Sequence, residues 1–177
     1  MADLLNKDSF ASRPLRVSIE GNVGCGKSTL IKYFKNFDDI DAKAEPLDEW
    51  RNVQGHNLLH LLYADQSRWN FTFQLYVQLS RLNLQTTQSD KKIQLFERSL
   101  QNSRHCFVEM AYHRGYLADL EYATLSEWYD WIEKNMDINL DLIVADILFV
   151  PCLKKDFFTV FICGQGHNNK QRRLQFE

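Results

Sequence analysis

The sequence predicts an α/β fold in which the strands of a parallel sheet alternate with helices. Three observations lead to this prediction: a strand pattern that enters a glycine-rich loop at 21–29, two later apolar runs at 93–99 and 140–150, and helical patterns between them. Such alternation is typical of a parallel sheet with right-handed crossovers and helices on both faces. The 177 residues fit one domain of ordinary size.

The first elements are predicted as strand, loop and helix. Residues 15–20, LRVSIE, alternate apolar and polar side chains, and 30–37, LIKYFKNF, continue a helix that begins near Lys27. An extended piece at 42–45 follows, and it ends at Pro46, which disfavours helix in the residue before it.

The later elements follow from periodicity. From residue 57 to about 88, apolar side chains recur at helical spacing and predict two helices separated near 65–67. The predicted elements after them are a buried parallel strand at 93–99, helices at 102–113 and 124–135, and a strand at 140–150 that is broken in the middle.

The loop GNVGCGKST matches the pattern G-x-x-x-x-G-K-[ST] in full, between a predicted strand and a predicted helix. Glycines let backbone N–H groups converge on phosphate oxygens, Lys27 reaches the outer phosphates, and Ser28 can ligate magnesium. The pattern therefore predicts a P-loop NTPase fold that binds ATP and Mg²⁺. The predicted nucleotide contacts are the whole loop: Gly21, Asn22, Val23, Gly24, Cys25, Gly26, Lys27, Ser28 and Thr29.

The glycine loop indicates the phosphate donor but leaves the acceptor open, because kinases, GTPases and motor ATPases share it. A GTPase needs an N-K-x-D sequence, and the nearest candidate, at 6–9, lacks the final Asp and precedes the loop. An ATPase needs an apolar strand that ends in Asp, and LIVAD, ending at Asp146, fits this pattern. An ATPase therefore stays open as an alternative.

Three further clusters contain the residue types of a kinase acceptor site. They are Glu45-Pro46 with Trp50, Phe73-Gln74, and Glu97-Arg98-Ser99. A carboxylate can take the proton of an acceptor hydroxyl, an Arg can stabilise the transferring group, and an amide between aromatic rings can bind a base edge.

These motifs, E-P-x-x-x-W, W-x-x-x-F-Q-x-Y-V and E-R-S, resemble the deoxyribonucleoside kinase family over roughly residues 15–144. The segments WRNVQGHN, SRWNFTFQLYVQL and LSEWYDWI also carry the resemblance. It implies transfer of the γ-phosphate of ATP to the 5′-hydroxyl of a deoxynucleoside. Glu45 would be the general base, Arg98 would face the phosphate, and Glu97 would assist magnesium or the sugar.

The resemblance also implies the residues that hold the substrate. In this assignment Gln74 pairs with the base, Phe107 stacks on it, Trp50 walls the pocket and Tyr63 holds the 3′-hydroxyl. Arg81 resembles the deoxycytidine kinase branch, which pairs this Arg with an Asp, but the matching position here is Ser103. A carboxamide can pair with either pyrimidine, so thymidine and deoxycytidine both stay open.

The same residues allow plainer interpretations. Glu45 and Glu97 taken singly are ordinary strand-end carboxylates, and Trp50 and Phe107 are equally suited to a hydrophobic core. Arg81 and Arg104 would then be solvated helix charges. Cys25 lies in the loop near a helix N-terminus, where a thiol can be reactive, so alkylation there would block ATP binding.

The resemblance stops after residue 144. The family continues into a helix, an arginine-rich lid and further elements, and residues 145–177 resemble none of these. We expect three regions: an N-terminal segment at 1–14, the kinase domain at 15–144, and a divergent, partly disordered tail at 145–177 without the lid. Within the tail, FFTVFIC at 157–163 predicts a substitute strand. An alternative function is a catalytically impaired isoform that binds nucleotide and pairs with an intact relative.

Composition bears on partners and compartment. The formal net charge is −2, which favours neither a nucleic-acid polymer nor an anionic membrane as partner, and no apolar run is long enough to span a bilayer. Asp3 and Asp8 disfavour a mitochondrial presequence, so we expect a cytoplasmic protein, with the mitochondrion as the alternative. The resemblance implies a homodimer.

Overall fold

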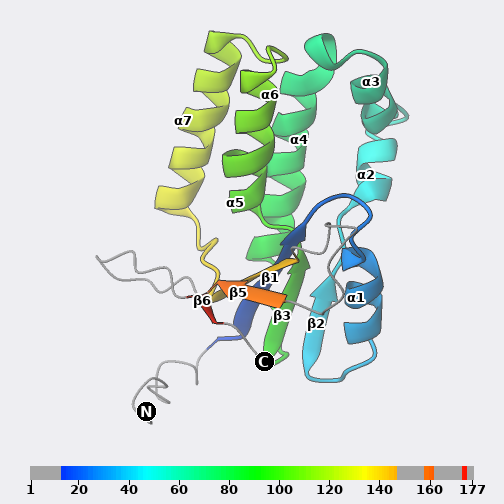
Figure 1. The fold of residues 1–177 in the computed structure, drawn as a ribbon, viewed down its shortest axis with the longest axis vertical. Helices are drawn as coiled ribbons and strands as arrows, with labels where there is room; N and C mark the ends of the chain where they lie inside the picture. Colours follow the sequence, from blue (N-terminus) through cyan, green and yellow to red (C-terminus); the bar gives the residue numbers. More distant parts are fainter. Residues whose placement is uncertain (1–12, 147–157, 162–172, 175–177) are drawn as a thin grey trace. The chain divides into compact units, whose positions relative to one another are not determined.

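The computed structural model describes residues 13–146, 158–161 and 173–174 (Figure 1). The chain divides into two compact units. The first, here the sheet unit, comprises residues 1–44, 88–97 and 139–177, and the second, the helical unit, comprises residues 45–87 and 98–138.

The sheet unit has six strands: β1 Leu15–Gly21, β2 Ile40–Lys43, β3 Ile93–Glu97, β4 Leu142–Asp146, β5 Phe158–Phe161 and β6 Arg173–Leu174. Their order in the sheet is β2-β3-β1-β4-β5-β6. The first four are parallel, which confirms the predicted parallel α/β sheet. Two antiparallel strands extend it, and the first of them, β5, lies inside the strand predicted at 157–163.

The strand boundaries differ from the predicted ones for local reasons. β2 pairs with β3 from Ile40 to Lys43, so the chain leaves the ladder before Pro46 and the strand lies two residues earlier than predicted. β3 ends at Glu97 because Arg98 adopts a left-handed conformation, with φ of 60°. β4 covers 142–146 of the run predicted at 140–150, and residues 147–150 lie outside the described part of the chain. Most of the tail that was expected to be disordered and to lack a lid also lies outside it.

Apolar side chains of β1 explain the core of the sheet unit. Val17 and Ile19 are buried and pack with Leu95 of β3 and with Ile31 of helix α1, Lys27–Phe34. α1 contacts β1, β2 and β3. It begins where predicted because Gly26, with φ of 95°, turns the chain out of the glycine loop in a conformation that glycine adopts without strain.

The helical unit contains α2 Leu47–Arg51, α3 Leu58–Ala64, α4 Gln66–Thr86, α5 Leu100–Asn102, the π-helix η1 Ser103–Val108, α6 Glu109–His113 and α7 Asp119–Asn135. The predicted break near 65–67 is confirmed: Asp65 is extended, and its carboxylate accepts a hydrogen bond from the N–H of Arg68. α7 begins earlier than the predicted residue 124, because the Glu121 side chain accepts the backbone N–H of Ala118 and caps the helix.

Helices α4, α6 and α7 run side by side in the helical unit (Figure 1). One buried cluster joins Leu82 of α4, Leu100 of α5, and Tyr129 and Ile132 of α7 with Ile138. Among the described residues, no helix has the length and apolar composition needed to cross a membrane.

Removal of a fully buried side chain should destabilise the helical unit. We expect Ile132→Ala to lower the free energy of unfolding by ~2–5 kcal/mol, because Ile132 has no exposed surface and the substitution leaves a cavity. Urea unfolding followed by tryptophan fluorescence measures the change. Leu120→Ala on the same helix is the matched control, since Leu120 is 78% exposed. Equal losses in the two variants would contradict this account of the core.

Candidate active site

The glycine loop joins β1 to α1 and is shaped by its backbone. Gly24 and Gly26 both have positive φ, 83° and 95°, where a side chain would strain the loop. Lys27 begins α1 and is almost fully buried, and its Nζ donates to the carbonyl oxygen of Asn22 at 2.5 Å. The ammonium group therefore lies back along the loop, where it can exchange a carbonyl oxygen for a phosphate oxygen.

A hydroxyl and a carboxylate meet beside the loop. Ser28 Oγ donates to Glu97 Oε1 at 2.5 Å, and Glu97 is the last residue of β3. Hydroxyl and carboxylate oxygens are hard ligands of the kind that Mg²⁺ takes, together with phosphate oxygens. The residues present therefore fit a magnesium–nucleotide complex, and Ser28 and Glu97 are the pair that could hold the metal.

In the helical unit, Glu45 is held by two arginines. Its Oε1 accepts hydrogen bonds from Arg98 Nη1 at 2.9 Å and from Arg81 Nη2 at 2.5 Å. All three side chains are at most 10% exposed. Arg98 keeps the left-handed backbone conformation that ends β3, and residues held in sparsely populated conformations cluster at functional sites.

Because Ser103 stands at the position of the partner Asp, Arg81 was expected to lack a carboxylate partner, and this expectation is wrong. The Asp that accompanies this Arg in the resembling branch is replaced by Ser103, but Glu45 supplies the carboxylate instead. Ser103 Oγ and Arg81 Nη1 both donate to the carbonyl oxygen of Ser99, at 3.3 Å each. The interpretation of Arg81 as a solvated charge is therefore also wrong. No sequence signal identifies this pair, because Glu45 and Arg81 are 36 positions apart.

Two predicted aromatic residues contact the same arginines. The Arg81 guanidinium lies 5.5 Å from the ring centroid of Trp50, and that of Arg98 lies 5.3 Å from the ring centroid of Phe107. Trp50 is further fixed by a 2.9 Å hydrogen bond from its Nε1 to Ser80 Oγ. Trp50 and Phe107 are thus brought together with Glu45 through its two arginines.

The remaining predicted substrate residues differ in their surroundings. Gln74 is 5% exposed, its Nε2 donates to Asn70 Oδ1 at 3.3 Å, and its Oε1 has no hydrogen-bond partner among the described residues. Tyr63, on α3, is 73% exposed. Gln74 is therefore buried, with an amide oxygen that accepts no hydrogen bond from any described residue, whereas Tyr63 lies at the surface.

Arg104 is not a solvated charge either. Its guanidinium pairs with the carboxylate of Glu109, and the hydrogen bonds that Glu109 accepts from Arg104 and from Tyr122 hold the pKa of that carboxyl below its usual range. This cluster stabilises the π-helix against α7.

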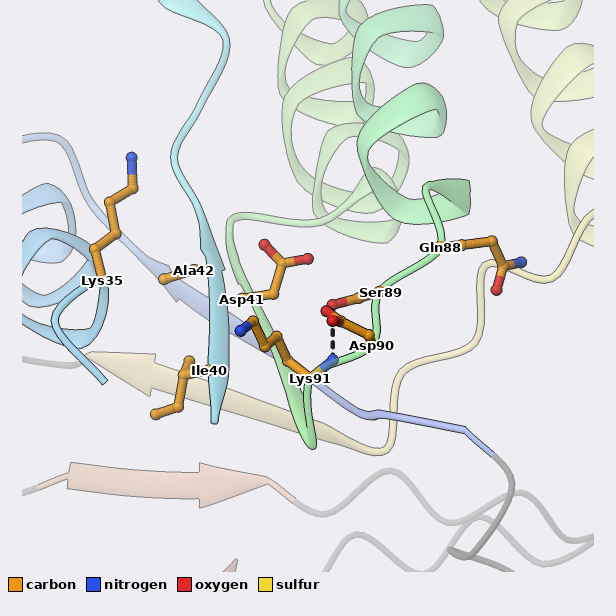
Figure 2. Close-up of a pocket in the computed structure, with 8 residues that line it drawn as sticks. All are labelled: Lys35, Ile40, Asp41, Ala42, Gln88, Ser89, Asp90 and Lys91. Atoms are coloured by element: carbon orange, nitrogen blue, oxygen red, sulfur yellow. Dashed lines mark hydrogen bonds between the residues drawn. The ribbon is translucent and has the colours of Figure 1, made fainter. Parts of the chain in front are cut away.

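A separate hollow of about 830 Å³ lies in the sheet unit (Figure 2). It is lined by the first residues of β2 and by residues 88–91, which precede β3. Ligands of parallel α/β sheets bind at the carboxyl ends of the strands, whereas this hollow lies at the amino ends. The hollow is lined by two basic and two acidic side chains, those of Lys35, Lys91, Asp41 and Asp90. This lining favours neither an anionic nor a cationic ligand.

Comparison with known proteins identifies the family of this chain. Residues 17–145 match the family model for deoxynucleoside kinase. The chain belongs to the deoxynucleoside kinase family. The match ends one residue after the position at which the resemblance was predicted to stop, and it confirms the predicted family.

Several curated members of the deoxynucleoside kinase family are similar to the chain. Mitochondrial thymidine kinase 2 of Macaca fascicularis is 46% identical over 128 residues, which are 72% of this chain and 48% of that protein. The Homo sapiens protein of the same name is 45% identical over 139 residues, 78% of this chain and 52% of its own. Deoxycytidine kinase 2 of Gallus gallus is 32% identical over 157 residues, 76% of this chain and 59% of its own. The chain thus spans about half the length of the thymidine kinases it matches.

Alkylation of Cys25 should block nucleotide binding. Cys25 Sγ lies 3.4 Å from Lys27 Nζ, so an adduct there would occupy the place of a phosphate. We expect N-ethylmaleimide to weaken ATP affinity by about tenfold or more, measured by titration calorimetry. The control is Cys25→Ser, which keeps the exposed Cys106 as a labelling site and should keep its affinity after treatment. Labelled Cys25 with unchanged affinity would refute the idea.

Proposed function

We propose that this chain transfers the γ-phosphate of ATP to the 5′-hydroxyl of a deoxynucleoside. The observation that carries the proposal is the largely buried carboxylate of Glu45, held by Arg81 and Arg98 in a chain whose glycine loop fits a nucleotide. Membership of the deoxynucleoside kinase family supports it.

The donor half of the reaction rests on the sheet unit. Backbone N–H groups of residues 21–29 and the N-terminus of α1 would bind the phosphates, and Lys27 would leave Asn22 to face them. Ser28 and Glu97 would hold the metal. When bound, Mg²⁺ neutralises charge on the phosphate oxygens.

The acceptor half rests on Glu45. Glu45 would take the proton of the 5′-hydroxyl while the 5′-oxygen bonds to the γ-phosphorus and the bond from that phosphorus to ADP breaks. Arg98 would hold Glu45 in place and face the phosphoryl group. Gln74 would pair with the base between Trp50 and Phe107. Because Tyr63 is exposed, its contact with the 3′-hydroxyl would have to form when substrate binds.

The proposed substrates are thymidine and deoxycytidine. The names of the similar proteins include both thymidine kinase and deoxycytidine kinase, and the amide of Gln74 can present its donor or its acceptor to either base. The thymidine kinases are called mitochondrial, which favours the mitochondrial alternative over the cytoplasm predicted from the sequence.

The ATPase alternative has one observation in its favour. Asp146 ends β4, in parallel register with Gly21 at the start of the glycine loop. The loop hydroxyl, however, pairs with a carboxylate of β3, since Ser28 donates to Glu97. We therefore place the metal at Ser28 and Glu97 and rank the ATPase second.

The proposed reaction is tested by transfer of labelled γ-phosphate from ATP to thymidine and to deoxycytidine. We expect transfer to both, and a loss of ~10²–10⁴-fold in Glu45→Gln, because the general base is removed. Glu49→Gln is the matched control, since Glu49 is exposed on α2 and should retain full activity.

Two outcomes would reject the kinase proposal. ATP hydrolysis that needs no acceptor, is lost in Asp146→Asn and survives in Glu45→Gln would identify an ATPase. A folded, ATP-binding chain that transfers nothing would leave the alternative of a non-catalytic isoform that pairs with an intact relative.

We also propose that the protein is a homodimer that pairs through α4 and α7. A groove of about 740 Å³ is lined mostly by apolar side chains, among them Leu75 and Leu79 of α4 and Trp128 of α7. These side chains are 38–45% exposed, and the ring of Trp128 stacks on that of Trp131, which is 50% exposed. Monomers seldom expose contiguous apolar patches of this kind, and a second copy would cover it.

A charge placed in this groove should separate the copies. We expect Leu79→Glu to halve the molar mass measured by light scattering after size exclusion, because a carboxylate would be buried without a partner. Leu120→Glu applies the same change to an exposed leucine outside the groove and should leave the dimer intact. A Leu79→Glu protein with the mass of the unaltered chain would show that this face is not the interface.

A further inference from the structure

Helix α4 buries five polar side chains along one face, at the helical spacings of four, four, three and four: Asn70, Gln74, Gln78, Arg81 and Gln85. Buried polar groups are nearly always hydrogen-bonded. Gln85 follows this rule, since its Oε1 accepts the N–H of Leu100 at 2.6 Å and its Nε2 donates to the carbonyl oxygen of Ile138 at 3.1 Å. The two terminal nitrogens of Arg81 follow it, since they donate to Glu45 and to the carbonyl oxygen of Ser99.

Gln78 differs from Gln85 and Arg81 on this face. Its side chain has no exposed surface, and neither its amide oxygen nor its amide nitrogen has a hydrogen-bond partner among the described residues. One turn earlier, Gln74 Oε1 also has no hydrogen-bond partner in the described part of the chain. Two consecutive turns of α4 therefore bury three amide atoms that form no hydrogen bond to any described residue. Such atoms lower stability, so a ligand or a bound water has to supply what the protein does not.

The neighbours of Gln78 indicate which ligand. Gln74, before it, is the proposed base-pairing amide, and Arg81, after it, binds the proposed general base Glu45. α4 packs against the π-helix η1, which carries Ser103 and Phe107, and π-helices occur frequently at functional sites. The apolar groove of α4 involves other residues of the helix, so Gln78 belongs to its buried polar face.

We propose that Gln78 is a second base-reading residue, whose amide hydrogen-bonds the polar edge of a pyrimidine beside Gln74, directly or through one ordered water. The inference rests on the proposed deoxynucleoside site. Two carboxamides on successive turns present donors and acceptors together, which matches the mixed donor and acceptor edge of thymine or cytosine. In this proposal the amide of Gln78 contributes to affinity for the base. Binding of the base also explains why a buried amide lacks partners among the described residues of the protein.

The test compares Gln78→Met with Gln85→Met, since Met has nearly the volume of Gln but no amide. For Gln78→Met we expect thymidine affinity to fall about tenfold in titration calorimetry, ATP affinity to stay unchanged, and the Tm of the free protein to hold or rise. For Gln85→Met we expect the opposite pattern: a lower Tm and unchanged thymidine affinity, because its hydrogen bonds are structural.

Each outcome decides between the two roles. Thymidine affinity unchanged in Gln78→Met overturns the inference, and so does a fall in Tm with unchanged affinity, which would make Gln78 structural. If Gln78→Met does not fold, Gln78→Leu is measured in the same way. An unaltered chain that binds ATP but neither nucleoside would refute the proposed function itself, and this inference with it.

Discussion

The residues proposed to bind the deoxynucleoside depend on one constraint: the carboxylate of Glu45 is shared by two arginines, Arg81 and Arg98. A buried Glu is tolerated when charged hydrogen-bond donors surround it, and Glu45 receives them from Arg81 in α4 and from Arg98 after β3. The cluster contains more positive than negative groups, which suits an anion such as a transferring phosphoryl group. Fixing Glu45 from two directions would also give the proposed general base a defined position, and positioning is most of what phosphoryl transfer requires.

The segment from Glu97 to Ser103 organises this arrangement with few residues. Glu97 accepts the hydroxyl of Ser28 in the sheet unit, and Arg98, the next residue, binds Glu45 in the helical unit. Ser99 caps α5 with its side chain, while its carbonyl oxygen accepts from Arg81 and Ser103. The donor and acceptor candidates are therefore adjacent along the chain, although they belong to different compact units.

Helix α4 combines two kinds of surface. Its buried surface includes a row of polar side chains from Asn70 to Gln85, and its other face contributes Leu75 and Leu79 to an exposed apolar groove. In the proposals above, one face serves the substrate and the other serves assembly. A substitution on this helix therefore has to be assigned to one face before its effect on activity is interpreted.

The sequence by itself determined the features that depend on neighbouring residues. The strand, glycine loop and helix at 15–34 and the helix break near Asp65 followed from periodicity and motif spacing, and the family followed from the resemblance of several motifs. Only the tertiary structure decided the carboxylate that pairs with Arg81, the antiparallel pairing of β5 with β4, and the lack of hydrogen-bond partners for Gln78 among the described residues. The physical reason is that these features join segments far apart in the chain, or depend on the absence of a partner in space, and residue spacing records neither.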